Sequence, residues 1–462
     1  MPNYLKLFII TFLLFGGTAF WNLDDIKANS TESNTELLVT VENEKQLQRI
    51  KSFLNSFDPN ANVEGIEEIN LLKVEASSLN QKAVLKKHLQ DKFSLDNEAI
   101  GNEQDVYLED ANNQTLSSTQ KAGTNSLSYL RTAQWDINNV TNQGKSYELQ
   151  KGNHSIKIGL IDSGIDFNHP DLSKNILDEG QSFVPGVDDT QDILGHGTMV
   201  AGSIAANGVQ LGVGPDLGLV PYKVFHDGSA ESFWIIEAII QAVEDEVDVI
   251  NLSLGTYKSS KSKEDKVVIK AYEKAVKYAK KNGVLVVASA GSNGYDISKP
   301  FDQDEESLNQ IHLPGGMKHV LTVAATTKEN TLASYSNYGK NVDLGAPGGD
   351  YGPNFTENQV FDIGSMVLTT YPMDVQQSLF AVYMGLPKGY DFSAGSSLAA
   401  PKVAATAGLI IAEYEELHGK KPKINKIEKF LLKGAIPDKE AKKNHQFRNG
   451  IVNAYQSLQL LQ

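Results

Sequence analysis

Three polar residues with distinctive flanks carry the chemistry that this sequence predicts. Asp162 ends an apolar, β-branched run, His196 lies in Gly-His-Gly-Thr-Met-Val-Ala-Gly, and Ser397 lies in Gly-Ser-Ser-Leu-Ala-Ala-Pro. A serine hydroxyl is a weak nucleophile and needs a base that accepts its proton. His196 can do this near neutral pH, and a buried carboxylate at Asp162 would fix the tautomer of the ring. Together the three residues predict nucleophilic catalysis.

The elements that must position these residues follow from their flanks. Residues 156–161 indicate a buried strand that ends at Asp162, and the apolar run 398–414 has the spacing of a buried helix. Ser397 would then lie at a helix N-terminus, where unpaired N–H groups and the helix dipole stabilise an anionic intermediate. Taken singly, Ser397 could be an N-cap, Asp162 a turn residue and His196 a loop residue. The order Asp, His, Ser with these flanks favours catalysis.

These motifs, in this order, resemble those of the subtilisin-like serine proteases, and the resemblance extends over roughly residues 135–455. It implies that Ser397 is the nucleophile, that His196 is the general base and acid, and that Asp162 orients the ring of His196. The expected activity is that of a serine endopeptidase, which needs no cofactor for catalysis.

Two further stretches narrow the resemblance. Residues 220–225, Val-Pro-Tyr-Lys-Val-Phe, and residues 312–316, His-Leu-Pro-Gly-Gly, resemble the lantibiotic leader peptidases of Gram-positive bacteria, such as the epidermin- and nisin-processing enzymes. This implies removal of the leader from a lantibiotic precursor outside the cell, after a basic residue. Two alternatives stay open: a general secreted degradative protease, and a catalytically silent peptide-binding homologue.

The resemblance also implies which backbone binds the substrate. In the family, an extended substrate pairs with the enzyme as an added strand. The matching residues are Gly228, Ser229 and Ala230 in one stretch, and Ser253, Leu254 and Gly255 in another.

The oxyanion donor is where this sequence departs from the family pattern. Family members place an asparagine directly after the Ala-Gly that ends the strand 286–290, whereas Ser292 takes that position here and Asn293 follows one residue late. Either a local shift presents Asn293, or Ser292 donates weakly, or the hole is impaired. An amide reaches further and holds its direction better than a hydroxyl, so we expect Asn293 to be the stronger donor.

Two aspartates match cation ligands of the family. Asp171 matches a calcium ligand, and Asp343 could join a second cation site. The loop that completes the first site in the family is short here, at residues 206–212, and calcium prefers several oxygen ligands. We therefore expect both aspartates to be ordinary structural residues, with a structural calcium ion as the alternative.

A run of acidic residues follows the oxyanion region, and by the resemblance this region walls the first specificity pocket. A carboxylate in that pocket would pair with a substrate guanidinium, which predicts Arg or Lys before the cleaved bond. The alternative is a solvated acidic loop. The same preference makes Lys121 or Arg131 the expected self-processing point. The acidic residues are Asp296, Asp302, Asp304, Glu305 and Glu306.

Composition excludes several classes of function. The formal charge of −15 and the pI near 5.1 argue against nucleic acid and anionic membrane surfaces as partners. The chain has no cysteine, which excludes disulfides, Cys–metal sites and thiol catalysis.

Four parts are expected along the chain. Residues 1–28 have a short positive region and an apolar run too short for a comfortable membrane span, as in a secretory signal peptide. Residues 29–109 predict a small α+β propeptide, a partner of the enzyme within its own chain. Residues 110–130 predict a flexible linker with the maturation site, and residues 131–462 the catalytic domain. No Leu-Pro-x-Thr-Gly motif is present, so we expect a secreted protein without a cell-wall anchor.

The fold class follows from the alternation of strands and helices after residue 156. This alternation predicts an α/β fold, a subtilisin-like doubly wound parallel sheet with helices on both faces. Active residues should gather at the carboxyl ends of its strands. In the propeptide, residues 35–41, 66–74 and 106–108 indicate strands, and residues 44–54 and 79–93 indicate helices.

Overall fold

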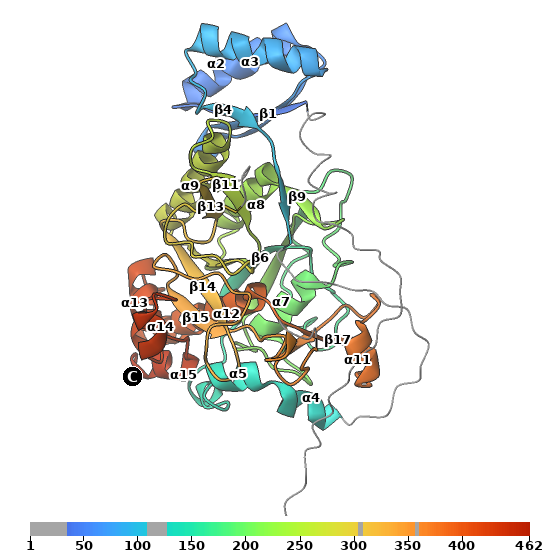
Figure 1. Ribbon diagram of the computed structural model, residues 1–462, viewed down its shortest axis with the longest axis vertical. Coiled ribbons are helices and arrows are strands. Elements are labelled where there is room, and N and C mark those ends of the chain that lie inside the picture. The colour runs from blue at the N-terminus through green and yellow to red at the C-terminus, as the bar shows by residue number, and fades with distance from the viewer. Residues whose placement is uncertain (1–34, 109–126, 304–307, 356–359) are drawn as a thin grey trace, which may run out of the picture.

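The computed structural model describes residues 35–108, 127–303, 308–355 and 360–462. A small N-terminal domain packs on one end of a larger α/β domain (Figure 1). The predicted signal peptide and most of the predicted linker lie outside the described residues.

The N-terminal domain is a four-stranded antiparallel sheet with two helices on one face. Its helices are α2 (Glu44–Phe57) and α3 (Leu79–Phe93), and the short 3-10 helix η1 (Glu67–Ile69) interrupts the stretch that the sequence indicated as one strand. In spatial order the strands are β2 (Asn62–Ile66), β3 (Leu71–Glu75), β1 (Glu36–Thr40) and β4 (Ile100–Asn102). Residues 35–102 therefore form an α+β domain, with both helices on one face of a small sheet.

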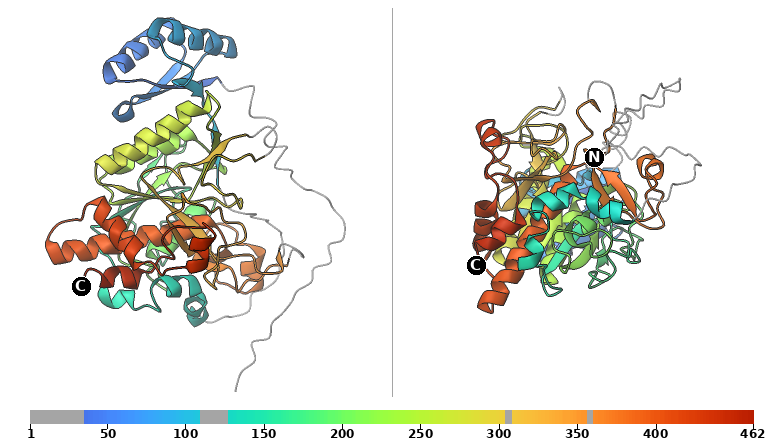
Figure 2. Two further views of the ribbon diagram at one scale, coloured as in Figure 1. Left: turned by 60° about the vertical axis from the view of Figure 1, so that its left-hand side comes forward. Right: turned by 90° about the horizontal axis from the view of Figure 1, so that it is seen from below.

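Side chains alternate across β1, so the sheet has two buried faces. Leu37 and Val39 pack under the helices with Leu47 of α2, whereas Leu38 packs against the larger domain. That second face lies over α9 (Asp265–Lys281), as Figure 2 shows, and Lys274 of α9 donates to the carbonyl of Ile69.

The strand that follows β4 belongs to the larger domain. Strand β5 (Asp105–Tyr107) pairs antiparallel with β9 (Ser229–Glu231) of that domain. The strand that the sequence indicated at residues 106–108 is therefore present as β5, but it pairs outside the sheet of the small domain. Strand β5 instead tethers the small domain to its neighbour.

The larger domain contains a seven-stranded sheet whose neighbouring strands are all parallel. Its order is β15 (Leu344–Pro347), β14 (Val320–Thr326), β12 (Leu285–Ser289), β10 (Val249–Leu252), β6 (Lys157–Asp162), β8 (Gly218–Lys223) and β7 (Gln181–Ser182). The predicted doubly wound α/β fold is confirmed.

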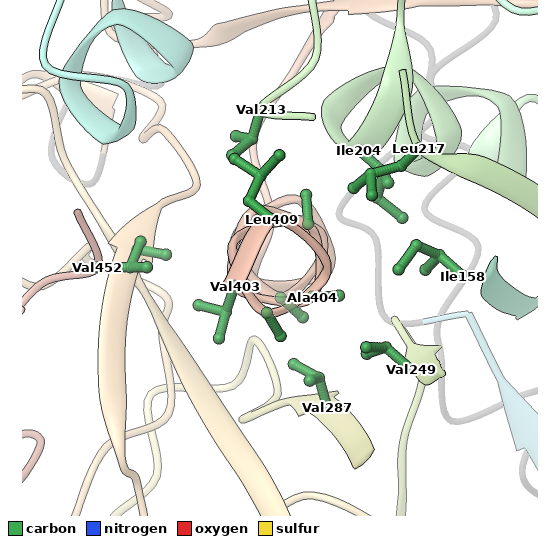
Figure 3. Packing of buried hydrophobic residues seen from close by; sticks show 14 of the residues in the cluster. Ile158, Ile204, Val213, Leu217, Val249, Val287, Val403, Ala404, Leu409 and Val452 are labelled. Atoms are coloured by element: carbon green, nitrogen blue, oxygen red, sulfur yellow. The ribbon is translucent and has the colours of Figure 1, made fainter. Parts of the chain in front are cut away.

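Helices cover both faces of this sheet, and alternate strand residues point to each. On one face, α7 (His196–Ala205) and α12 (Ser396–His418) pack on a cluster that includes Ile158 and Val287 (Figure 3). On the other face, α8 (Ser232–Glu244) and α9 pack on a cluster that includes Ile161 and Val286. Burial on both faces explains why these strands are almost continuously apolar.

The remaining elements surround this core. They are α4 (Leu127–Ala133), α5 (Trp135–Val140), α6 (Ser146–Leu149), β11 (Thr256–Ser259), β13 (Gln310–Leu313), β16 (Val367–Thr370), α11 (Leu379–Tyr383), β17 (Tyr390–Ser393), α13 (Ile424–Gly434), α14 (Lys439–Lys443) and α15 (Ala454–Gln459). Within the described residues, no helix combines the length and the apolar character needed to cross a membrane.

Candidate active site

Asp162 and His196 form a buried pair at the carboxyl end of the sheet. Asp162 is the last residue of β6, and His196 is the first residue of α7. The Nδ1 atom of His196 lies 2.6 Å from Oδ1 of Asp162, and the two residues are 3% and 1% exposed. A carboxylate in this position holds the proton on Nδ1 and leaves Nε2 as the basic nitrogen.

Glycines on both sides of His196 allow this close packing. Gly195 has a φ of 101°, and a Cβ on it would lie 2.3 Å from the ring of Tyr371. A Cβ on Gly197 would lie 2.0 Å from the carbonyl oxygen of Gly164, in the turn after Asp162. A side chain at Gly195 would therefore clash with Tyr371, and one at Gly197 would push α7 away from the turn after β6.

Ser397 is the second residue of α12 and is fully buried. Ser253 donates from Oγ to the carbonyl oxygen of Ser397 (2.6 Å), which ties this helix to the end of β10. Met199 of α7 and Leu398 of α12 share one buried cluster, so the first turns of the two helices meet. The structure therefore brings together the ends of the two helices that carry His196 and Ser397.

Ser292 lies closer to the predicted nucleophile than Asn293 does. The Oγ atom of Ser292 is 2.9 Å from Oγ of Ser396 and accepts a bond from the N–H of Ser396 (3.3 Å). Asn293 is exposed, and its Oδ1 atom accepts from the hydroxyl of Tyr257 (2.8 Å). The geometry thus favours Ser292 as the side chain that faces the start of α12, against our expectation for Asn293.

Strand β5, which follows the N-terminal domain, pairs with the two stretches that were predicted to bind substrate. Within β5, Val106 pairs with Ala230 and Tyr107 with Ser229, and the N–H of Leu108 points to the carbonyl of Gly228 (3.5 Å). Tyr107 also forms a bridge with Gly255 on its other side.

Both predicted stretches therefore flank β5. Together they contain Gly228, Ser229, Ala230, Ser253, Leu254 and Gly255. The arrangement is that of an extended peptide added as a strand between two enzyme segments.

Charged groups are buried where the two domains meet. Glu103 accepts at Oε1 from the N–H of Ser232, the first residue of α8 (3.0 Å), and Lys73 of β3 forms an ion pair with Glu231. Burial raises the pKa of Glu103 to about 8 and that of Glu231 to about 7, the latter against the opposing effect of Lys73. Burial lowers the pKa of Lys258 to about 8. Nothing in the local sequence pattern indicated these residues.

The two described acidic residues of the predicted specificity pocket form hydrogen bonds to the backbone of their own loop. Asp296 accepts at Oδ1 from the N–H of Ser298 (2.9 Å), and Asp302 accepts at Oδ1 from the N–H of Asn309 (2.8 Å); both are exposed. Residues 304–306, the other three acids, lie outside the described residues. These contacts are typical of the solvated-loop alternative.

The two predicted cation ligands are engaged by hydrogen-bond donors. Asp171 accepts from the N–H groups of Val209 (2.8 Å) and Gln210 (2.9 Å) and from the hydroxyl of Tyr390 (2.9 Å). Asp343 accepts from the N–H of Thr322 (3.0 Å) and pairs with Arg448, whose guanidinium supplies the opposite charge.

The carbonyl oxygens of Gly208 and Val209, in the loop that follows α7, accept from the guanidinium of Arg131. Donors surround both carboxylates, so these residues do not fit a calcium site. Among the described residues, no group of three or more His, Asp or Glu could hold a metal ion.

Asn337 organises the oxyanion region, and the sequence analysis missed it. Its Nδ2 atom donates to the carbonyl of Ala290 (2.9 Å) and to the hydroxyl of Tyr257 (2.7 Å). Its Oδ1 atom accepts from the N–H groups of Asn293 (3.2 Å) and Tyr295 (2.8 Å). An asparagine in a loop 46 residues further along the chain than Gly291 gives no local signal of this contact.

The comparisons with known proteins agree with this geometry. The Subtilase family model matches residues 153–452. The chain is 32% identical over 353 residues, 70% of this chain and 74% of the relative, to an epidermin leader peptide-processing serine protease of Staphylococcus epidermidis. It is 30% identical over 332 residues, 65% of this chain and 46% of the relative, to a nisin leader peptide-processing serine protease of Lactococcus lactis subsp. lactis.

A solved structure extends the likeness to the N-terminal domain. The epidermin leader peptide processing serine protease from Staphylococcus aureus is similar with a TM-score of 0.72 and 26% identity, over 93% of this chain and 99% of that chain. Since the family model spans most of the chain, the protein belongs to the subtilase family and is a subtilisin-like serine protease.

Proposed function

We propose that this protein is the zymogen of an extracellular endopeptidase that removes the leader from a lantibiotic precursor through an Asp162–His196–Ser397 triad. The observation that carries the catalytic part is the buried Asp162–His196 pair beside the first turn of α12. The family membership and the named activities of the relatives support the substrate class.

The proposed reaction uses each group for one task. Ser397 Oγ attacks the substrate carbonyl while Nε2 of His196 takes its proton, and Asp162 stabilises the resulting imidazolium. The N-terminus of α12 and the hydroxyl of Ser292 stabilise the oxyanion. His196 then returns the proton to the leaving amine, and a water molecule releases the acyl group by the same steps in reverse.

The pairing of β5 with β9 supports a zymogen. A strand held on both sides in the substrate position blocks access of other peptides while it remains bound. We therefore propose that the N-terminal domain is an inhibitory propeptide and that cleavage in the segment after residue 108 activates the enzyme. Arg131 is a poor processing point because it lies within α4, and a protease cleaves an extended chain.

The export of the protein and its preference for a basic residue are proposed from the sequence. Residues 1–28 have the pattern of a signal peptide, and the charge of −15 attracts a cationic leader. Asp296 and Asp302 give this preference no direct support, because each caps a backbone N–H of its own loop.

A fluorophosphonate probe tests the catalytic part. The mature protein should be labelled at Ser397, and Ser397→Ala should abolish both labelling and precursor cleavage. Ser457→Ala, which alters a remote buried serine of α15, should retain both. An unlabelled protein would identify the silent peptide-binding alternative.

The substrate class needs a separate comparison. A modified lantibiotic precursor and an unfolded casein should be offered at equal concentration. Cleavage of the precursor at the leader junction, with a higher kcat/KM than for casein, supports leader processing. Equal kcat/KM values for the two would instead identify a general secreted protease.

A further inference from the structure

Lys223 is a fully buried lysine beside the proposed triad, and no step of the mechanism above uses it. It is the last residue of β8 and pairs in register with Asp162, the last residue of β6. Its ammonium donates to the carbonyl oxygens of Ser163 (2.6 Å) and Gln191 (2.9 Å). These two residues directly follow Asp162 and directly precede Asp192.

The contacts of Lys223 belong to the network that supports Asp162 and His196. The N–H of Ser163 donates to Oδ1 of Asp162 (2.8 Å), and the Ser163 hydroxyl donates to Asp192 (2.9 Å). The same hydroxyl accepts from the N–H of Gly197, in the first turn of α7 (2.9 Å). Lys223 is therefore bonded to the turn at Ser163, which connects the carboxylate of Asp162 to helix α7 and so to His196.

The charge of Lys223 matters because the carboxylates around it are buried. Asp162 and Asp192 are each 1% exposed. Burial raises the pKa of Asp192, and hydrogen bonds from Thr198, Gly195 and Leu194 oppose that rise by favouring the ionised carboxylate. Burial lowers the pKa of Lys223, while the charges of Asp192, Asp189 and Asp162 oppose that effect. Two negative charges out of water require a positive charge near them.

We propose that Lys223 is a positioning residue for the triad, which fixes the turn after Asp162 and supplies a buried positive charge that opposes protonation of His196. The inference rests on the proposed catalytic role of Asp162 and His196. By this inference, Lys223 determines both the conformation of the turn after Asp162 and the pH below which kcat/KM falls.

Loss of the Lys223 charge should raise the pKa of His196. Without the ammonium, the surroundings of His196 become more negative, the imidazolium is stabilised and the ring binds its proton more tightly. As a general scale, one unit charge placed about 10 Å from a titrating group, at an effective dielectric constant of about 20, shifts the pKa of that group by roughly one unit. The titratable groups around this network are Asp162 on β6, Asp166 after it, Asp189 and Asp192 before α7, and Tyr371 after β16.

The test is the pH profile of kcat/KM for two variants that lose the charge. In Lys223→Gln the amide can still donate to the two carbonyl oxygens, whereas in Lys223→Met it cannot. Both variants should move the acid limb upward by about half a unit to one unit at low salt. Lys223→Met should in addition lower kcat, because the turn after Asp162 loses its two bonds.

Lys157→Met is the matched control. Lys157 begins the same strand that Asp162 ends, and its ammonium donates to the carbonyl of Asp245 at the far end of the sheet (2.6 Å). This variant should leave the acid limb in place. Melting temperatures of all variants, each also carrying Ser397→Ala, separate a loss of folding from a loss of charge.

Two results distinguish this inference from the proposed function. If the wild type reacts with the fluorophosphonate probe but both Lys223 variants keep its acid limb, Lys223 has only a structural role and the inference is overturned. If the wild type does not react with the probe, the triad itself fails. A shift in both Lys223 variants but not in Lys157→Met establishes the inference.

Discussion

The carboxylate of Glu103, in the N-terminal domain, accepts a hydrogen bond from the N–H of Ser232, the first residue of α8 in the protease domain. The second oxygen of this carboxylate is buried and has no hydrogen-bond partner among the described residues. Burial raises the pKa of Glu103 to about 8 in this position. The bond thus joins the two domains through a group whose protonation depends on their contact.

Inhibition by the separate N-terminal domain should weaken as the pH rises. Once released, Glu103 is exposed and returns to a pKa of about 4.3, so the complex binds one more proton than its free parts between about pH 4.3 and pH 8. Inhibition is therefore strongest below this window, and Glu103 alone weakens it by at most about tenfold per pH unit through the window. Glu231, whose pKa burial raises to about 7, acts in the same direction.

The inhibition constant, measured from pH 5 to pH 8, tests this dependence. Glu103→Gln keeps an acceptor for Ser232 but cannot ionise, so its inhibition constant should vary less with pH and should be lower than that of the wild type at pH 8. The buried Lys258 acts in the opposite direction above pH 8, which is why the series stops there. A wild-type constant that is flat or falls with pH would contradict the prediction.

Ser292→Ala should reduce kcat more than Asn293→Ala. The hydroxyl of Ser292 faces Ser396, next to the proposed nucleophile, whereas Asn293 is turned toward Tyr257. Loss of a well-placed oxyanion donor costs about 10²–10³ in turnover, and we expect about tenfold or more for this hydroxyl. Asn293→Ala should stay within about twofold. Single-turnover kinetics check the ranking, and a larger loss for Asn293→Ala would restore the expectation drawn from the sequence.

How far the sequence predicted this site depends on whether each feature is local. The strand before Asp162 and the helix that begins at Ser396 follow from short apolar patterns, so both were found. The position of Ser292 was not, because it depends on the turn at Gly291, whose φ is 98°. The partner of β5 was also missed, since a three-residue strand carries no information about which distant edge it joins.

Residues whose partners are distant in the sequence could not be identified from local sequence patterns. Asn337 reaches the oxyanion loop across 46 residues, and Lys223 meets Ser163 only because β6 and β8 are neighbours in the sheet. Spacing along the chain can indicate a motif but cannot show which strands lie side by side. For the same reason, the run of acidic residues after residue 295 was interpreted as part of a specificity pocket. In the described part of this loop, Asp296 and Asp302 instead accept hydrogen bonds from the loop's own backbone.

Asp136→Asn should destabilise the protease domain by about 3–5 kcal/mol. Asp136 and Lys402 form an ion pair of 2.9 Å between α5 and α12, with the two side chains 2% and 0% exposed. The variant leaves a buried ammonium without its counter-charge. Replacing both residues, as Asp136→Leu with Lys402→Met, should restore most of the stability. Urea unfolding in a Ser397→Ala background measures both, and a loss below about 1 kcal/mol for Asp136→Asn would contradict the argument.

Removal of calcium should not lower the melting temperature. The carbonyl oxygens of Gly208 and Val209 accept from the guanidinium of Arg131, and Asp171 is occupied by N–H donors, so the loop already has its positive charge. Arg131→Gln should lower the melting temperature by a few degrees, as expected for the loss of exposed charge-assisted bonds. Scans of both proteins with a chelator and with excess calcium test this. A wild type whose melting temperature falls in the presence of the chelator would contradict the prediction.

The first self-cleavage should follow Glu109, and its position tests the expected preference for a basic residue. Tyr107 forms an antiparallel bridge with Gly255, and the hydroxyl of Ser253, two residues before Gly255, donates to the carbonyl of Ser397. We therefore expect the cleaved bond to lie two residues after Tyr107 in the sequence. Residue 109 itself lies outside the described residues.

Lys121, the competing point in the linker, lies twelve residues further along the chain. The two sites give different mature N-termini, Asp110 after the first and Ala122 after the second. Intact mass and N-terminal sequencing of protein sampled through maturation distinguish them, with Ser397→Ala as the uncleaved control. We expect Asp110 to appear first and Glu109→Ala to change its rate, while Lys121→Ala leaves that rate unchanged. If Ala122 appeared first and only Lys121→Ala slowed it, the register argument would fail and the basic preference would gain its first direct support.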